Sequence, residues 1–351
     1  MAVLAALVVV AAVVLLVIGR SGASGSSRSA SATNTSGRST SSASPTTLPA
    51  TGSSADPTTT RLSPTTVAAV DPNYGVDSVD LPIYAHNNAG ATVPVPTTVW
   101  YPSTTRTTRM PLVVFSPGYQ IDPSVYVPLL QAWASAGYVV AEAVYPDTAP
   151  GSPQIEYDMI NHPGELSQVI STLLGDSSGG SVPFAGRIDS NEIAVAGQSD
   201  GGDVSLAAVA NTCCTDHRIK AAVILSGAEA QLFPGTYYTG TGNPPILAIQ
   251  GDADTINPPG CSAQLYDGAA PPRYYLDLPG ATHLSAYTGS GPQFGAVTEV
   301  STAFLDGYLK GVSGRISSLG SLAQASGVSS LVSGATVVPI SGGCPGAPAA
   351  S

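Results

Sequence analysis

The segment 193–203, IAVAGQSDGGD, holds a serine between glycines in the pattern G-x-S-x-G. Four apolar residues precede the pattern, as in a strand, and the run DVSLAAVAN that follows it predicts a helix. A strand that turns sharply into a helix raises the serine hydroxyl above the strand ends, where it can act as a nucleophile in acyl transfer. Gly197 and Gly201 leave out the side chains for which so tight a turn has no space. This context predicts Ser199 as a nucleophile.

The same five-residue pattern occurs again as GDSSG, at 175–179. In a chain with 38 glycines the pattern alone is weak evidence. This second match follows a helical pattern and runs into further Gly and Ser, so it predicts the end of a helix and a loop. Ser177 is therefore not predicted to be a nucleophile.

A serine hydroxyl needs a base to take its proton and an acid to orient that base. The chain has four histidines, of which His86 and His162 precede Ser199. After a strand–serine–helix turn, the acid and then the histidine follow the serine along the chain. His217 comes too soon, beside the end of the predicted helix. This leaves His283 as the predicted base, in the loop LPGATHLSAY directly after a predicted strand.

The candidate acids follow a predicted strand at 246–249, which opens into the loop QGDADTINP. Asp252 and Asp254 both lie past the carboxyl end of that strand, where functional residues collect in open α/β sheets. Their spacing along the chain does not show which of the two is the acid that orients the histidine. One carboxylate is the predicted acid, and the other is expected to hold the loop as a turn residue.

The oxyanion of an acyl-transfer reaction needs backbone N–H groups already in place. One predicted donor is the N–H of Asp200, which follows the serine. The other is expected in the loop PGYQ, 117–120, which comes directly after a predicted strand at 112–116. Gly118 permits a tight turn there, so we predict the N–H of Tyr119 as the second donor and its ring as a wall of the acyl site.

The elements that must position these residues alternate along the chain from about residue 67. Continuous apolar runs of four or five residues suit strands covered on both faces, so we predict an α/β domain with a mostly parallel, doubly wound sheet flanked by helices. The predicted strands are 97–101, 112–116, 138–141, 193–196, 221–225, 246–249 and 274–278. The predicted helices are 125–135, 164–174, 203–211 and 294–309.

The chain divides into four predicted parts. Residues 1–19 begin with 18 apolar residues, close to the ~30 Å span of a bilayer, and predict a transmembrane anchor; a cleaved signal segment is the alternative. Either reading places the later domain at the outer side of the cell membrane or in the medium. Residues 20–67 form a Ser/Thr/Ala/Gly/Pro-rich linker that we expect to be disordered. The catalytic domain is predicted at 68–312, and a Ser/Gly/Ala-rich tail at 313–351.

The charge balance excludes one class of partner. Twelve basic and 23 acidic residues give a net charge of −11, whereas nucleic acid binding needs basic surfaces. The four cysteines, 213, 214, 261 and 344, allow three pairings and have no zinc-site spacing. Because a bridge between adjacent cysteines needs a strained ring, we expect Cys213 and Cys214 each to reach Cys261 or Cys344; free buried thiols are the alternative. Two disulfides would agree with an exported domain.

The stretches named above resemble the α/β-hydrolase fold. More narrowly, they resemble its branch of dienelactone-hydrolase-like proteins, platelet-activating-factor acetylhydrolases, chlorophyllases and bacterial polyester hydrolases. The resemblance spans about residues 90–310 and rests on TTVWYP (97–102), PLVVFSPGYQ (111–120), ASAGYVVAEAVYP (134–146), HPGELSQVISTLL (162–174), IDSNEIAVAGQSDGG (188–202), GDADTINP (251–258) and PGATHLSAY (279–287). It implies Ser199 as nucleophile, His283 as base and Asp254, rather than Asp252, as acid. It also implies Tyr119 and Asp200 as oxyanion donors.

Two residues beside the serine depart from that family pattern. Gln198 stands where the family usually has His, and Asp200 stands where Met, Leu or Phe is common. A carboxylate near the forming oxyanion opposes it unless it is paired or points to solvent.

The aromatic wall of polyester hydrolases also has no evident tryptophan here. Trp100 and Trp133 both belong to early elements. We expect Phe233, Tyr237 or Tyr238 to take that place, and Tyr119, Gln120 and Phe233 are the predicted substrate contacts.

The sequence thus predicts a serine hydrolase that cleaves carboxylic esters, on a small-molecule, lipid or polyester substrate, with no cofactor or metal. An acyltransferase or peptidase would use the same triad, and a catalytically silent envelope-binding domain is the alternative from another class. The oligomeric state is left open.

Overall fold

The computed structural model describes residues 73–106, 108–152, 155–180, 182–239, 242–289, 291–334 and Cys344. The predicted anchor at 1–19, the linker at 20–67 and most of the end of the tail lie outside these residues. No helix within the described ranges is long and apolar enough to cross a membrane.

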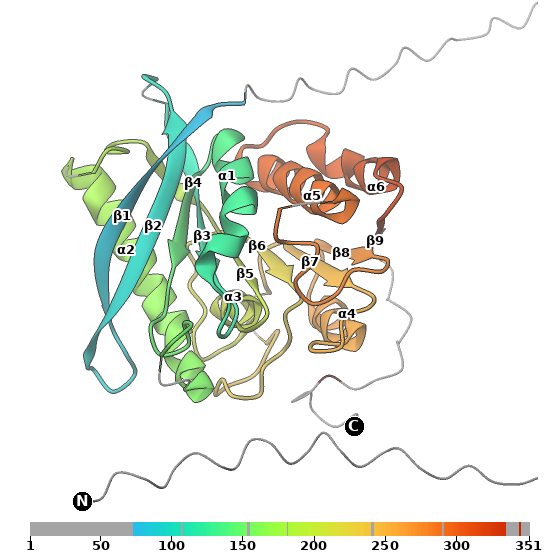
Figure 1. Ribbon diagram of the computed structural model, residues 1–351, viewed down its shortest axis with the longest axis horizontal. Coiled ribbons are helices and arrows are strands. Elements are labelled where there is room, and N and C mark those ends of the chain that lie inside the picture. Colours follow the sequence, from blue (N-terminus) through green and yellow to red (C-terminus); the bar gives the residue numbers. More distant parts are fainter. Residues whose placement is uncertain are drawn as a thin grey trace, which may run out of the picture. The chain divides into compact units, whose positions relative to one another are not determined.

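The described residues form one nine-stranded sheet in the order β1-β2-β4-β3-β5-β6-β7-β8-β9 (Figure 1). Strands β3 to β8 run parallel, whereas β1, β2 and β9 pair antiparallel with their neighbours. The strands are β1 Gly75–His86, β2 Thr92–Ser103, β3 Met110–Ser116, β4 Val139–Ala143, β5 Ile188–Gln198, β6 Ile219–Leu225, β7 Ile246–Gly251, β8 Arg273–Leu278 and β9 Ser330–Ser333.

Helices cover both faces of this sheet (Figure 1). Alternate residues of β3 show why: Leu112 and Val114 pack toward α2, α3 and α4, whereas Val113 and Phe115 pack toward α1, α5 and α6. The helical segments are η1 Pro123–Tyr126, α1 Val127–Ser135, η2 Glu156–Asn161, α2 His162–Gly179, α3 Asp200–Ala210, α4 Pro259–Gly268, α5 Pro292–Leu309 and α6 Arg315–Ala325. The predicted fold class, a mostly parallel sheet flanked by helices, is confirmed.

The seven predicted strands and four predicted helices are present, most of them longer than predicted, but five elements were not predicted. The missed elements are β1, η2, α4, α6 and β9. Strand β1 is largely exposed along its length and pairs with β2, so it lacks the apolar run of a central strand. Helix α6 and strand β9 come from the sequence expected to be a tail, yet Leu319 and Ala323 of α6 are buried in the core.

One local prediction was wrong at the second G-x-S-x-G match. Helix α2 does not end before GDSSG but continues through Gly179, and Gly180 follows in the left-handed conformation. The serines of this match therefore lie on a helix. Ser177 is buried on this helix, so its hydroxyl faces the interior of the domain and not solvent.

The predicted disulfide pairing was also wrong. Cys213 is bonded to Cys214, and Cys261 is bonded to Cys344. Cys261 lies fully buried on α4, where the chain beyond β9 returns to within 4.7 Å between Cα atoms. Because each sulfur forms one disulfide, this closure leaves the two adjacent cysteines after α3 with one another.

A buried acid on β4 makes the stability of this fold depend on pH. Glu142 is 2 % exposed, and its Oε1 is buried without a hydrogen-bond partner. Burial, and to a smaller degree Asp122, raises the pKa of Glu142 to about 8 from 4.5. Between these values the unfolded chain loses the proton that the folded chain keeps, so the free energy of unfolding falls as the pH rises from about 5 to 8.

We expect Glu142→Gln to raise the midpoint of thermal unfolding by several degrees at pH 8.5 and to leave it nearly unchanged at pH 5, because the amide carries no such proton. Unfolding followed by circular dichroism at both pH values measures this. Glu299→Gln, an exposed change on α5, is the control and should shift neither midpoint. Equal shifts of the Glu142 variant at both pH values would contradict the interpretation.

Candidate active site

The passage from β5 to α3 takes a single residue, Ser199. Its backbone lies at φ 55° and ψ −127°, a region that residues with a side chain rarely occupy. The Ser199 N–H donates a hydrogen bond to the carbonyl of Leu225 at the end of β6, and its own carbonyl accepts one from the N–H of Asp203. Ser199 therefore sits in a strained turn between strand and helix, as the sequence predicted.

The two flanking glycines are required by contact with other backbone. A Cβ on Gly197 would overlap the carbonyl oxygen of Gly201, and a Cβ on Gly201 would overlap the carbonyl oxygen of Ser116 at the end of β3. Backbone atoms cannot give way as a flexible side chain can. These glycines thus allow α3 to start directly against β3 and β5.

An acid–base pair lies at the same edge of the sheet. His283 Nδ1 and Asp254 Oδ2 are 2.8 Å apart, and both residues are buried. Asp254 Oδ1 accepts hydrogen bonds from the N–H groups of Ile256 and Asn257, and Oδ2 also accepts one from Gln250 Nε2. Burial alone would raise the pKa of Asp254, but the hydrogen bonds and the imidazole outweigh it and hold the pKa below its usual range. Asp254 is thus a stable carboxylate.

The structure separates the two candidate acids. Asp252 is exposed, and its Oδ1 accepts a hydrogen bond from the N–H of Gly280 in the turn after β8. It therefore holds a loop, whereas Asp254 faces the imidazole.

Ser199 and the Asp254–His283 pair lie at one edge of the sheet because β5, β6, β7 and β8 run parallel. Ser199 follows β5, Asp254 follows β7 and His283 follows β8, and the carboxyl ends of these strands lie at one edge of the sheet. A hydrogen bond of 2.9 Å from Gln198 Nε2 to the carbonyl of His283 joins the serine turn to the histidine loop. Among the described residues no hydrogen bond joins Ser199 Oγ to His283; in unliganded enzymes such bonds often tighten only around the substrate.

The predicted oxyanion donors come from two segments that touch. Asp200 is the first residue of α3, where the N–H groups have no partner within the helix. Tyr119 lies in the turn after β3, and Gly118 beside it packs against Gln198, since a Cβ on Gly118 would lie 3.2 Å from the Gln198 carbonyl oxygen. The two main-chain segments therefore flank the same turn.

The carboxyl group of Asp200 has only part of its hydrogen-bonding capacity satisfied and is not turned fully to solvent. The residue is half-buried, and its Oδ2 is buried without a hydrogen-bond partner. Burial first, and Glu156 second, raises the pKa of Asp200 to about 7, while His283 acts in the opposite direction. This carboxyl group is neutral in acid and charged in mild alkali.

Two predicted substrate contacts lie in supporting positions. Gln120 Nε2 donates to the carbonyls of Thr148 and Ala149 and to Ser152 Oγ, so this side chain holds the neighbouring loop. Phe233 is 3 % exposed and packs in the core on the side of α2, α3 and α4. Tyr119 is half-buried beside the serine turn.

Both tryptophans, Trp100 and Trp133, are buried in the core on the side of α1, α5 and α6, which is the face of the sheet opposite to Phe233.

Several polar residues of the site were not predicted. Gln250, fully buried, bonds Asp254 and accepts a hydrogen bond from Ser262 of α4. Asn257 Nδ2 donates to the carbonyl of Ser226, and the hydroxyl of Tyr287 bonds the carbonyl of Ile249. The sequence did contain a signal for Gln250, because it is a polar residue at the end of an otherwise apolar strand. No sequence pattern marked Tyr287 as part of the site.

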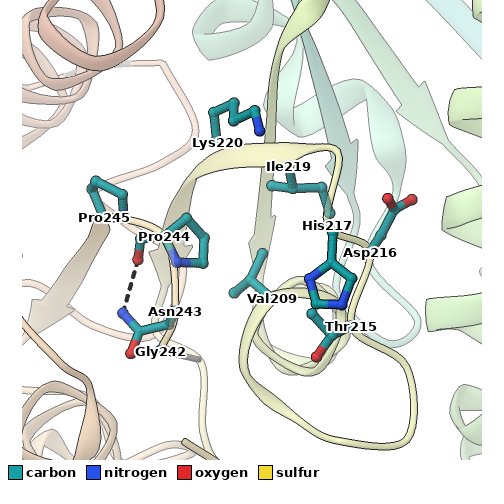
Figure 2. Close-up of a pocket in the computed structure, with 10 residues that line it drawn as sticks. All are labelled: Val209, Thr215, Asp216, His217, Ile219, Lys220, Gly242, Asn243, Pro244 and Pro245. Atoms are coloured by element: carbon teal, nitrogen blue, oxygen red, sulfur yellow. Dashed lines mark hydrogen bonds between the residues drawn. The ribbon is translucent and has the colours of Figure 1, made fainter. Parts of the chain in front are cut away.

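A surface hollow of about 290 Å³ lies elsewhere on the domain (Figure 2). It is lined by Val209, Thr215, Asp216, His217, Ile219, Lys220, Gly242, Asn243, Pro244 and Pro245. These residues surround the amino ends of β6 and β7, whereas Ser199, Asp254 and His283 follow carboxyl ends. His217 thus belongs to another surface, and within the described ranges no group of three or more His, Cys, Asp or Glu could hold a metal ion.

Residues 55–311 match the model of the PET hydrolase-like family. The chain belongs to this family. The matched range, well over half of the chain, includes Ser199, Asp254 and His283, and the predicted α/β-hydrolase relationship is confirmed. Membership indicates a hydrolase that acts on esters. None of the curated proteins matches the chain.

The two G-x-S-x-G matches of this PET hydrolase-like chain provide a matched test of the strained turn. We expect Gly197→Ala to lower the free energy of unfolding by at least about 3 kcal/mol, because its methyl group meets backbone. Gly175→Ala lies on an exposed helical position with open space around it, and should raise stability by up to about 1 kcal/mol. Urea unfolding measures both; similar effects of the two changes would contradict the proposed packing.

Proposed function

We propose that the protein is a serine hydrolase that cleaves carboxylic esters through Ser199, His283 and Asp254, with an acyl-enzyme intermediate. The observation that carries the proposal is the 2.8 Å contact between His283 Nδ1 and Asp254 Oδ2 at the sheet edge where Ser199 stands in a strained turn. Family membership supports the reaction class, and the geometry supports the roles of the three residues.

The contact with Asp254 determines how His283 can act. A carboxylate only accepts hydrogen bonds, so Nδ1 carries the proton and Nε2 of the neutral imidazole is left as the base. His283 then takes the proton of Ser199 as Oγ attacks the acyl carbon. The Asp254 carboxylate stabilises the imidazolium that forms.

The remaining steps use the main chain and water. The N–H groups of Asp200 and Tyr119 are the proposed donors to the negative oxygen of the tetrahedral intermediate. His283 passes its proton to the leaving alcohol, and the ester of Ser199 with the acyl group remains. Water, activated by His283, then releases the acid. No step requires a metal or a cofactor.

The substrate class follows from the family. The PET hydrolase-like match supports polymeric esters as substrates to test beside small and lipid esters. A p-nitrophenyl ester series from acetate to palmitate, with a polyester film, would rank them. Added alcohols and amines would reveal acyl transfer, and a peptide panel would reveal peptidase activity.

Export of the protein is part of the proposal. The apolar residues 1–18 support an anchor or a signal segment, and a disulfide between Cys261 and Cys344 suits an oxidising compartment. The catalytic domain would then act outside the cytoplasm.

We expect Ser199→Ala to lower kcat for a p-nitrophenyl ester by at least about 10⁴-fold, because the nucleophile is lost. A fluorophosphonate probe should label the native protein and not this variant. Ser177→Ala, in the helical G-x-S-x-G match, is the control and should keep both turnover and labelling. A native protein that neither turns over esters nor takes the label would be a silent binding domain, for which the half-buried carboxyl group of Asp200 is the specific hint.

The charge of Asp200 predicts a pH dependence. Because the pKa of Asp200 is raised to about 7, its charged form appears beside the oxyanion donors as the pH rises from 6 to 8 and opposes the developing negative charge. We expect the ratio of kcat/KM between Asp200→Asn and the native enzyme to rise roughly 10-fold from pH 6 to pH 9. The variant keeps the main-chain N–H.

Glu156→Gln provides the control for this prediction. Glu156 raises the pKa of Asp200, so its removal should move the loss of kcat/KM to lower pH. A pH-independent ratio for Asp200→Asn would show that its carboxyl group does not reach the reacting atoms.

A further inference from the structure

Gln198, the last residue of β5, carries a fully buried amide directly before the serine. A buried amide needs partners at both ends. Its Oε1 accepts a hydrogen bond of 2.7 Å from the hydroxyl of Tyr126, and its Nε2 donates one of 2.9 Å to the main-chain carbonyl of His283. The side chain thus joins two segments that are distant in sequence.

The partners determine the direction of each hydrogen bond. The carbonyl of His283 can only accept, so it faces Nε2 of Gln198. The hydroxyl of Tyr126 accepts a hydrogen bond of 3.3 Å from the N–H of Gly118, so its own proton points to Gln198 Oε1. Burial raises the pKa of Tyr126, which therefore keeps this proton. A single chain of hydrogen bonds runs from the turn after β3 to the histidine loop.

Both ends of this chain belong to the proposed catalytic machinery. Gly118 precedes Tyr119, and it lies so close that a Cβ on Gly118 would be 2.7 Å from Gln198 Oε1. At the other end, Asp254 holds the ring of His283, and Gln198 holds its main chain. Within the described residues His283 makes no backbone–backbone hydrogen bond, so the amide of Gln198 is its main-chain anchor.

We propose that Gln198 is a positioning residue that sets the imidazole of His283 and the Gly118–Tyr119 turn at fixed places around Ser199. It acts through the main chain of His283 and through Tyr126, not on the reacting atoms. This role rests on the proposed ester hydrolysis and adds a residue to it.

The test replaces Gln198 with methionine, which has similar length and forms neither hydrogen bond. For a p-nitrophenyl ester, Gln198→Met should lower kcat by about 10- to 100-fold and leave KM within about 3-fold, because orientation rather than binding is lost. The low-field proton NMR signal of the hydrogen-bonded Nδ1–H of His283 should broaden. Tyr126→Phe should lower kcat in the same direction. The fold decrease in kcat of the double variant should be smaller than the product of the two single decreases, because both changes break the same chain of hydrogen bonds.

Tyr138→Phe is the matched control for loss of a buried tyrosine hydroxyl. The Tyr138 hydroxyl bonds Asp306 on α5, so the change should lower the unfolding midpoint and leave kcat and the NMR signal unaltered. The proposal is overturned if Gln198→Met changes stability but neither kcat nor the signal, or if the two single losses multiply in the double variant. A native protein without ester turnover or labelling at Ser199 would overturn the proposed function instead, and the NMR signal would still decide the role of Gln198.

Discussion

The rest of the site depends on the passage of the chain from β5 to α3 through Ser199 alone. A residue at φ 55° persists only where its surroundings enforce it. Here the N–H of Ser199 is held by β6, and the missing side chains of Gly197 and Gly201 let the start of α3 approach β3. The raised hydroxyl follows from this one turn, and so do the N–H groups at the helix start, which have no partner within α3.

Buried polar groups around the turn divide into two kinds. Asp254 accepts hydrogen bonds on both oxygens, and the amides of Gln198 and Gln250 are partnered at both ends, so these groups keep one state. Asp200 and Glu142 each carry a buried oxygen without a partner, and burial raises both pKa values toward neutrality. Asp254 therefore stays a carboxylate over the pH range in which Asp200 and Glu142 change charge.

The central strands could be predicted because burial on both faces leaves a continuous apolar run in the sequence. Strand β1 lacks this signal, since it is largely exposed and owes its place to pairing with β2. Helix α6 and strand β9 are rich in Ser and Gly and resemble a tail until packing against α5 and β8 is known. Such elements are stabilised by tertiary contacts more than by local propensity.

The sequence by itself determined the strand–serine–helix segment and the order of serine, acid and histidine, because turn sterics and apolar periodicity are local properties of the chain. Residue spacing left Asp252 and Asp254 open and only the family resemblance favoured Asp254, whose contact with His283 the tertiary structure shows. Only the tertiary structure decided which cysteines pair and that Gln198 spans from Tyr126 to the histidine loop. Each of these depends on which distant segments meet at one edge of the sheet. Residue spacing along the chain contains no measure of that proximity.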